Sequence, residues 1–289
     1  MSRSLTVRSV ILSFLLLTAS ACSSTDDLPA AVAGELGHIH DLVRTESGNL
    51  LIATHSGLYR IDGPATASPV GPDRHDLMAM TVDNDNNLVA SGHPDLRRED
   101  WRSPDKPPLM GYAVSDDEGE TWSPSALLGD ADFHAIVIHR DSTITAAESG
   151  GSIMSSSDTQ SWETLGDLEA FDLTANPQDQ LELLGTDYDQ VLHHSTDGGA
   201  TWTPIATPAL TVIDWTSGQL VGVDADGTVW TTTTVDSDWT QMGSAPLGVE
   251  ALLVEGGAMW VGVEGGSIYH AASTHSPDFE LIFEPPQHD

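Results

Sequence analysis

The sequence predicts an all-β protein that folds as a single β-propeller of six four-stranded blades over residues 36–285. Two observations carry this prediction: a strand-rich unit recurs along the chain, and a polar turn with Gly and Trp recurs within it. Units of about 40 residues with four short strands are typical of propeller blades. The first strands begin near His38, Asp76, Phe133, Ala170, Thr211 and Val249, with one insertion in the second unit.

Each unit has the same order of elements. A first strand, a polar turn, a β-branched second strand and a Gly turn lead to a third strand, the recurring turn and a short fourth strand. Residues 279–283 are expected to form the outer strand of the last blade. The chain holds six such units, so the sequence predicts six blades rather than seven.

The recurring turn has the pattern S-x-D-x-G-x-T-W. It is complete at residues 115–122 and 195–202, and degenerate copies occur at 156–162 and 236–239. An Asp side chain can accept bonds from turn N–H groups, Gly adopts positive φ, and Trp can pack between blades. The role predicted for these residues is therefore structural: Ser115, Asp117, Gly119, Trp122, Ser195, Asp197, Gly199 and Trp202.

The N-terminal region has the features of an export signal. Arg3 and Arg8 precede an apolar run at residues 10–17, and small residues then lead to Cys22, the only cysteine. This arrangement resembles a bacterial lipobox, and an ordinary secretory signal is the alternative. It predicts a lipoprotein signal peptide at 1–21, a lipidated Cys22 with a flexible tether to residue 35, and a short tail at 286–289. The protein would then be exported and anchored by lipid to the outer face of the cytoplasmic membrane or the cell surface.

Composition excludes several classes of function. The chain has 289 residues, with 10 Lys and Arg against 44 Asp and Glu, and a net charge of −34. Such a chain repels phosphate backbones, so nucleic-acid binding is not expected. A single Cys rules out an internal disulfide and a cysteine-based zinc site. The acid excess favours a soluble monomer in a salty medium, and attraction of cations is a second interpretation.

Aligning the blades brings histidines to one end of the propeller. Numbering each hairpin outward from its turn places His40 opposite His55, Met78 opposite His93, and His134 opposite Ser149. Opposed residues in a hairpin share a face, with Cβ atoms about 5 Å apart. The same arithmetic places Asp172 opposite Asp187.

The histidines with one methionine form a candidate metal site at the channel mouth: His38, His40, His55, Met78, His93 and His134. Imidazoles with a thioether suit copper, whereas imidazoles with carboxylates suit zinc, iron or nickel. Copper and zinc are therefore the candidate cofactors. Any one of these histidines could instead be a hydrogen-bonded residue at a blade interface.

Two further groups of residues are candidates for ligand chemistry. Carboxylates at the same end of the blades could catalyse glycoside cleavage, which needs two carboxylates about 5–9 Å apart: Glu148, Asp172, Asp187, Glu250 and Glu264. The insertion at residues 94–108 is a candidate loop for an anionic ligand or a stacked sugar through Arg97, Arg98, Trp101 and Arg102. Alternatively, its charges pair with local acids and hold the loop in place.

The turn motif and several strings resemble a bacterial family of exported Asp-box (BNR repeat) β-propeller lipoproteins, labelled sialidase-like or "glycosylhydrolase". The strings are HIHDL at 38–42, ATHSGLY at 53–59, DLM at 76–78, SGHP at 91–94 and DFHA at 132–135. The label implies glycoside cleavage. However, sialidases of this type use three arginines, and no arginine follows Arg140 here. If the protein is an enzyme, we expect a glycoside hydrolase other than an Arg-triad sialidase.

Three functions follow as hypotheses. The first is a surface-anchored propeller that binds a small molecule, a glycan or a transition metal at its His/Met cluster. The second is a glycoside hydrolase that uses the carboxylates at the channel mouth. The third is an interaction scaffold that helps to assemble membrane or envelope complexes.

Overall fold

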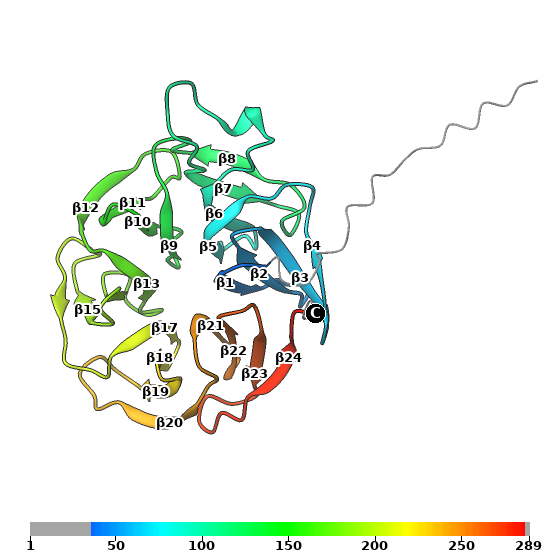
Figure 1. Ribbon diagram of the computed structural model, residues 1–289. Helices are drawn as coiled ribbons and strands as arrows, with labels where there is room; N and C mark the ends of the chain where they lie inside the picture. Colours follow the sequence, from blue (N-terminus) through cyan, green and yellow to red (C-terminus); the bar gives the residue numbers. More distant parts are fainter. Residues whose placement is uncertain (1–35, 287–289) are drawn as a thin grey trace, which may run out of the picture.

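The computed structural model describes residues 36–286 and shows six antiparallel sheets of four strands around a central opening (Figure 1). The predicted fold is confirmed, including the number of blades. The expected signal peptide, Cys22 and the tether lie outside the described residues. Within 36–286, no helix has the length and apolar character needed to cross a membrane.

Every blade is one continuous stretch of chain whose strands pair in sequence order. Blades 1 to 3 contain β1 (Ile39–Arg44), β2 (Leu50–Thr54), β3 (Gly57–Gly63), β4 (Thr66–Pro69), β5 (Asp76–Val82), β6 (Leu88–His93), β7 (Tyr112–Ser115), β8 (Ser123–Ala126), β9 (Phe133–Ile138), β10 (Ile144–Glu148), β11 (Ser152–Ser156) and β12 (Glu163–Asp167). Blades 4 to 6 contain β13 (Ala170–Ala175), β14 (Leu183–Asp187), β15 (Leu192–Ser195), β16 (Thr203–Pro204), β17 (Leu210–Thr216), β18 (Gln219–Asp224), β19 (Thr228–Thr232), β20 (Thr240–Ser244), β21 (Val249–Glu255), β22 (Ala258–Val263), β23 (Ile268–Ala271) and β24 (Glu280–Phe283).

The first strand of each blade is the innermost, and these six strands line the central opening (Figure 1). Each packs against the first strand of the next blade, and β21 packs against β1 to complete the ring. Blade 6 closes on blade 1 through side chains: Phe283 of β24 lies in one apolar cluster with Ile39 and Tyr59. The ring therefore holds its inner strands in fixed positions around the opening.

The hydrophobic core is divided among the blade interfaces. An apolar cluster lies between each pair of neighbouring blades, built from aliphatic side chains with aromatic or methionine side chains packed in or against it. The tryptophan of the recurring turn joins the interface with the preceding blade, as Trp122 does between blades 1 and 2 and Trp202 between blades 3 and 4. Both tryptophans thus contribute apolar surface to a blade interface.

The two complete S-x-D-x-G-x-T-W turns have nearly identical hydrogen bonds. In the first, Asp117 accepts from Thr121 N at 2.8 Å and from Thr121 Oγ1 at 2.6 Å, while Gly119 N donates to Ser115 Oγ at 2.8 Å. In the second, Asp197 accepts the same two bonds from Thr201 at the same distances. The Asp carboxylate therefore ties the turn together.

We expect Asp117→Ala to lower the free energy of unfolding by about 2 kcal/mol, because it removes several charge-assisted hydrogen bonds from a turn. Urea denaturation followed by tryptophan fluorescence measures this change. The exposed neighbour Asp116 provides the matched control, and Asp116→Ala should change stability by less than about 0.5 kcal/mol. Equal effects of the two substitutions would contradict the structural role of the turn.

Candidate functional site

A β-bulge interrupts the inner strand of every blade near its first residue. In blade 1, Ile39 pairs with Thr54 and Asp41 pairs with Ala53, so His40 is the extra residue. The bulged residues of the six blades are His40, Met78, His134, Phe171, Thr211 and Glu250. Bulges often re-aim side chains beside functional sites, and here five of the six side chains line the central cavity.

These bulges correct the pairings predicted from the hairpin turns. His40 is not paired with His55, and Asp76 rather than Met78 pairs with His93. Phe133 pairs with Glu148, and Ala170 rather than Asp172 pairs with Asp187. The prediction assumed an uninterrupted ladder, whereas each bulge absorbs one residue of the inner strand.

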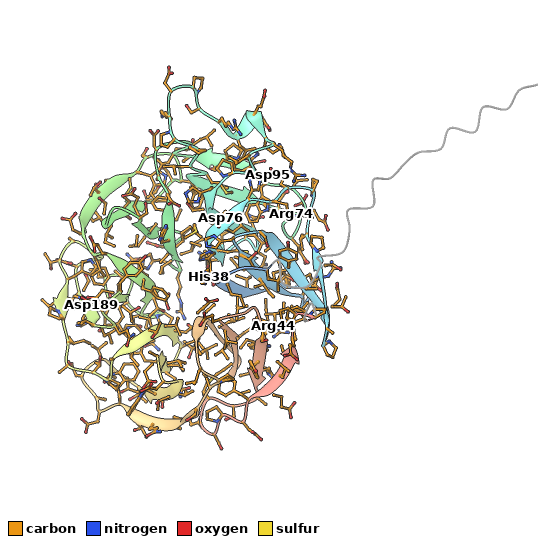
Figure 2. All side chains as sticks on the ribbon, in the orientation of Figure 1. His38, Arg44, Arg74, Asp76, Asp95 and Asp189 are labelled. Atoms are coloured by element: carbon orange, nitrogen blue, oxygen red, sulfur yellow. The ribbon has the colours of Figure 1, made fainter. Side chains whose placement is uncertain are left out.

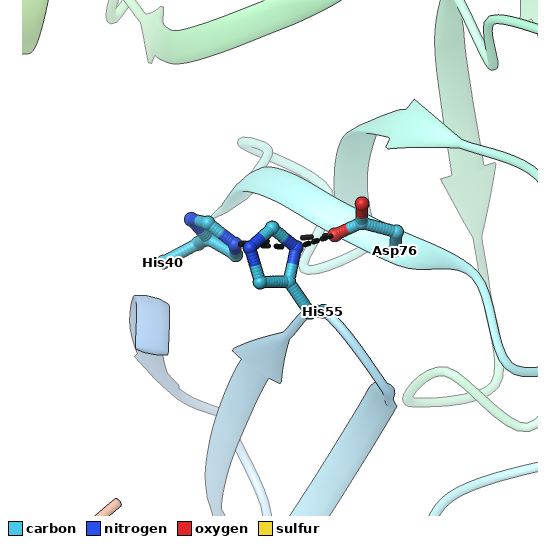
Figure 3. A group of neighbouring side chains, drawn as sticks. All are labelled: His40, His55 and Asp76. Atoms are coloured by element: carbon cyan, nitrogen blue, oxygen red, sulfur yellow. Dashed lines mark hydrogen bonds and ion pairs between the residues drawn. The ribbon is translucent and has the colours of Figure 1, made fainter. Parts of the chain in front are cut away.

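Two of the predicted residues, His40 and His55, nevertheless converge with a carboxylate at the channel mouth. His40 Nε2 lies 3.3 Å from His55 Nδ1, which lies 2.7 Å from Asp76 Oδ1 (Figure 3). The distance from His40 Nε2 to the same Asp76 oxygen is 3.9 Å. One ligand atom from each of the three residues therefore lies within 4.8 Å of the other two.

The polar contacts continue from Asp76 along the rim of blades 2 and 3. His93 Nδ1 lies 3.3 Å from Asp76 Oδ2, and its Nε2 lies 3.6 Å from Asp132 Oδ2. The same Asp132 oxygen lies 3.2 Å from His134 Nε2. Imidazoles and carboxylates thus alternate in one continuous arc. We call this arc the rim arc, and its members are His40, His55, Asp76, His93, Asp132 and His134.

His38 lies beside the rim arc and contacts blade 6 instead. Its Nδ1 is 2.6 Å from Glu250 Oε1, while Ile39 N donates to Glu250 Oε2 at 2.9 Å. The hydrogen bond that His38 donates to the Glu250 carboxylate raises the pKa of His38. Figure 2 shows His38 and Asp76 on the side of the ribbon that faces the central opening.

The electrostatics of the rim arc favour neutral His40 beside a charged Asp76. Burial, reinforced by the neighbouring His55, lowers the pKa of His40 to about 4. Burial opposes ionisation of Asp76, but hydrogen bonds from His93 and His55 lower its pKa overall. The hydrogen bond to Asp76 in turn raises the pKa of His93. His40 therefore offers a free lone pair at neutral pH, next to an anionic oxygen.

The remaining predicted residues lie in different surroundings. Met78 lines the cavity as a bulged residue. Asp187 caps its own turn by accepting from Asp189 N and Val191 N at 2.9 Å each, and Asp224 caps the equivalent turn of blade 5. Glu148 accepts from Gly150 N at 3.2 Å, and Glu264 follows the second strand of blade 6, where Glu264 N donates to Gly248 O.

A cavity of about 1030 Å³ runs along the inner strands behind the mouth. Its wall carries three aspartates whose oxygens accept backbone N–H groups, and each bridges to the next blade. Asp41 accepts from Met80 N at 3.1 Å, Asp172 from Ile213 N at 2.8 Å and Asp214 from Val254 N at 2.7 Å. Asp172, predicted at the mouth, thus lies beyond the bulge in the wall of the cavity.

Burial raises the pKa of Asp214 from 3.8 to about 7. The folded chain therefore keeps a proton on Asp214 that the unfolded chain releases. The stability that this bound proton contributes to the fold is complete below about pH 4 and is lost as the pH rises through about 7. In the wild type, the free energy of unfolding falls as the pH rises through that window. In Asp214→Asn, the slope of this fall should be smaller by about 1.4 kcal/mol per pH unit. Urea titrations at several pH values measure the slope. Asp226→Asn, in an exposed turn, should leave it unchanged.

The insertion of blade 2 is held by its own charges. Arg97 donates to both oxygens of Asp95, Arg98 bonds Asp73 and Asp100, and Arg102 donates to the Leu96 carbonyl. Trp101, in a short 3-10 helix (Glu99–Trp101), is 1% exposed and packs against His75. Figure 2 places Asp95 away from the opening. These contacts support the second interpretation of the loop, and a buried Trp101 cannot stack on a sugar.

Sequence reasoning missed three residues of the site: Asp76, Asp132 and Tyr188. Asp76 and Asp132 occupy the same place in blades 2 and 3, two residues before the bulged Met78 and His134. The strings DLM and DFH contain that signal, because both put an acid two residues before the bulged side chain. Tyr188 follows β14, and its hydroxyl oxygen is 3.5 Å from His134 Nδ1.

Comparison with known proteins places these features in a widespread fold. Residues 105–212, which span blades 3 and 4 with adjoining parts of blades 2 and 5, match the family described as DUF6242 beta propeller domain. No curated protein matches the chain. Among solved structures, it is similar to a virginiamycin B lyase from Staphylococcus aureus, with 18% identity, a TM-score of 0.56, and coverage of 88% of this chain and 86% of that chain.

A gluconolactonase from Xanthomonas campestris is similar as well, with 12% identity, a TM-score of 0.62, and coverage of 86% of this chain and 88% of that chain. A chain of a nidogen/laminin complex has 15% identity, a TM-score of 0.61, and coverage of 82% and 93% respectively. At such identities the likeness shows the six-bladed propeller fold. The fold thus occurs in both enzymes and binding proteins, so function has to be argued from the site.

Proposed function

We propose that this propeller binds a divalent transition metal at the mouth of its channel, through His40, His55 and Asp76. The observation that carries the proposal is the convergence of three ligand atoms from blades 1 and 2. Metal–ligand bonds of about 2.0–2.2 Å place neighbouring ligand atoms about 3–3.5 Å apart. The observed separations of 3.3, 2.7 and 3.9 Å surround that range.

The chemistry of the ligands favours zinc over copper. Two imidazoles and one carboxylate form a borderline set that suits zinc, iron or nickel, whereas copper sites more often add sulfur. The low pKa of His40 helps, because a metal competes with protons for the imidazole lone pair. His93 bonds the second oxygen of Asp76 and can hold the carboxylate in place, as outer partners of metal sites commonly do.

Three protein ligands leave coordination positions for water or a substrate, which is typical of catalytic rather than structural zinc sites. His40 also lines the large cavity, so the site faces space that a ligand could enter. The similar structures include a catalytically inactive histidine-to-alanine variant of virginiamycin B lyase with quinupristin. The inactivity of that variant supports an active site built from histidines here.

The glycoside hydrolase hypothesis finds less support in the contacts of its candidate carboxylates. Asp172 and Asp187 accept backbone N–H groups that link blades or close a turn. Glu250 is bound by His38 and by Ile39 N. These contacts explain the three carboxylates as structural groups, whereas no such role accounts for the meeting of His40, His55 and Asp76.

We also propose that the propeller is exported and anchored to a membrane by lipid on Cys22. This proposal rests on the basic and apolar N-terminal sequence and on the position of the single cysteine. Anchoring would place the metal site outside the cytoplasm, where the strong acidic charge of the chain raises the local concentration of cations. Metabolic labelling with a radioactive fatty acid in cells, with Cys22→Ser as the unlabelled control, tests it.

Calorimetric titration of the metal-stripped full-length protein with Zn²⁺, and separately with Cu²⁺, tests the metal proposal. We expect one equivalent of Zn²⁺ to bind. Loss of an outer partner of a metal ligand costs up to about 100-fold in affinity, and His40→Ala should weaken zinc binding by more than that. His270→Ala provides the matched control, because His270 lies on β23, packs at a tilted angle against Trp260 and is not among the described residues that line the cavity. No stoichiometric uptake, or equal uptake by His40→Ala, would overturn the proposal.

A further inference from the structure

His134 occupies the channel mouth with its two ring nitrogens in different surroundings. As the bulged residue of β9, it lines the central cavity. Its Nε2 lies 3.2 Å from Asp132 Oδ2, and its Nδ1 lies 3.5 Å from the Tyr188 hydroxyl. A carboxylate at Nε2 fixes the proton on that nitrogen, which leaves the Nδ1 lone pair free to accept a proton.

Asp132 has the features of a group that orients a base. It is 5% exposed, and its Oδ1 is buried with no hydrogen-bond partner among the described residues. A buried carboxylate oxygen that lacks a partner is costly, so its presence needs an explanation. Its other oxygen contacts His134, and an imidazole that gains a proton beside this carboxylate would gain a partner of opposite charge.

We propose that His134, positioned by Asp132, is the general base of a hydrolytic site that cleaves neutral carboxylic esters or lactones at the channel mouth. This inference rests on the proposed metal site, whose ion would polarise the substrate carbonyl as a Lewis acid. His134 and the three metal ligands belong to one rim arc, linked through Asp76, His93 and Asp132. A base and an electrophilic centre thus lie on the same edge of one cavity.

The reaction is balanced without any further reagent. The oxygen of a water molecule forms a bond to the carbonyl carbon while His134 Nδ1 takes the proton that the water loses. The bond between that carbon and the ester or ring oxygen then breaks. His134 returns the proton to the departing oxygen, so the products are a carboxylic acid and an alcohol and the base is regenerated.

The charge of the mouth selects for a neutral substrate. Asp76, Asp132 and Glu250 lie around it, and Glu169 and Glu264 lie close enough to influence Tyr188 and His38. Among the described residues that line the cavity, the arginines are Arg44, the last residue of β1, and Arg140, which follows the end of β9. Phosphate esters and anionic peptides would be repelled here, whereas an uncharged ester or lactone would not.

Tyr188 indicates the direction from which a reacting group reaches His134. The ring of Tyr188 stands edge-on to Phe171 with a centroid distance of 5.6 Å, and the residue is 60% exposed. Its hydroxyl oxygen lies 3.5 Å from His134 Nδ1, and both residues line the cavity. A water molecule or a substrate oxygen that takes the place of this hydroxyl would meet the same lone pair.

Turnover by the zinc-loaded full-length protein tests the inference. The probes are 4-nitrophenyl acetate, γ-butyrolactone and glucono-1,5-lactone. We expect hydrolysis of at least one probe, and His134→Gln should lower kcat/KM by about 100- to 10,000-fold, the range for loss of a general base. His270→Gln, on the outer part of blade 6, should retain wild-type turnover.

The positioning role of Asp132 has a separate readout. Asp132→Asn should lower kcat with little change in KM, because the side chain that fixes the proton on His134 Nε2 is lost while the substrate contacts remain. Asp132→Glu should restore part of the rate. A loss carried mainly by KM, or no recovery of rate in Asp132→Glu, would overturn the positioning role.

Metal titration of the same variants separates this inference from the proposed metal site on which it rests. His134→Gln should bind zinc like the wild type. Failure of the wild type to bind zinc would count against the metal site. Normal zinc binding with no turnover of any probe, or with equal turnover by His134→Gln, would overturn the assignment of His134.

Discussion

Gly92→Ala is expected to destabilise the protein by about 3 kcal/mol or more, because it combines backbone strain with a severe steric clash. Gly92 has φ of +135°, and a Cβ atom there would lie 2.1 Å from Asp76 O and 2.8 Å from Met78 N. Both contacts are with backbone, so no side chain can rotate away. The pairing of β5 with β6 would have to open beside the bulge at Met78.

Urea denaturation of both proteins measures this difference. Gly63→Ala is the matched control, because Gly63 also lies in a strand but a Cβ atom there would meet nothing within 4 Å. The control should stay within about 0.5 kcal/mol of the wild type. A Gly92→Ala protein as stable as the control would show that the β5–β6 register is softer than the structure indicates.

The same substitution should disturb the rim arc. His93 follows Gly92 directly and pairs with Asp76 across the hairpin. A shift of β6 would move His93 away from both Asp76 and Asp132, which it now links. Backbone geometry and site geometry are therefore coupled at this glycine, as the close approach of the two strands requires.

Local signals in the sequence were sufficient to predict the fold. The turns around Asp117 and Asp197 repeat because each blade needs the same side-chain bonds in the same place. The Trp122 and Trp202 side chains then pack at the preceding interface. A motif whose contacts lie within eight residues can be read without knowing the rest of the structure.

The site was predicted only in part, because bulges and partner choice depend on three dimensions. A bulge changes the register by one residue, and nothing in the hairpin turns reveals it. Met78 and His93 were therefore paired wrongly, although both lie near the mouth. Asp76 and Asp132 were overlooked because an uninterrupted ladder puts Met78 and His134, two residues later, at the paired positions of the mouth, whereas the rim arc alternates imidazole with carboxylate.

The loop of blade 2 shows the opposite error, because the sequence suggested a binding function there that the contacts of the loop do not support. Its arginines stand out in an acidic sequence and attracted a functional interpretation. However, Asp95, Asp73 and Asp100 were equally visible in the sequence, and they are the partners that the structure assigns to Arg97 and Arg98. Charges of both signs within one short segment more often neutralise each other than bind a ligand.

Asp76→Ala should cause the greatest loss of metal affinity of any single substitution in the rim arc. Asp76 contributes the only carboxylate of the proposed ligand set and also bonds both His55 and His93. Loss of a partner that merely orients a ligand costs about 10- to 100-fold in affinity. Removing a ligand together with the contacts that orient a second ligand should exceed that range.

Asp76→Asn separates the two roles of the carboxylate. The amide oxygen of Asn can still accept a hydrogen bond from His55, but a neutral amide is a much weaker zinc ligand than a carboxylate. Zinc titration should therefore rank the affinities as wild type, then Asp76→Asn, then Asp76→Ala. Asp226→Ala, in a turn of blade 5 away from His40 and His55, should bind zinc like the wild type. If Asp76→Ala also kept its affinity, the ligands would have to be found elsewhere on the rim, with His93 and Asp132 as the next residues to replace.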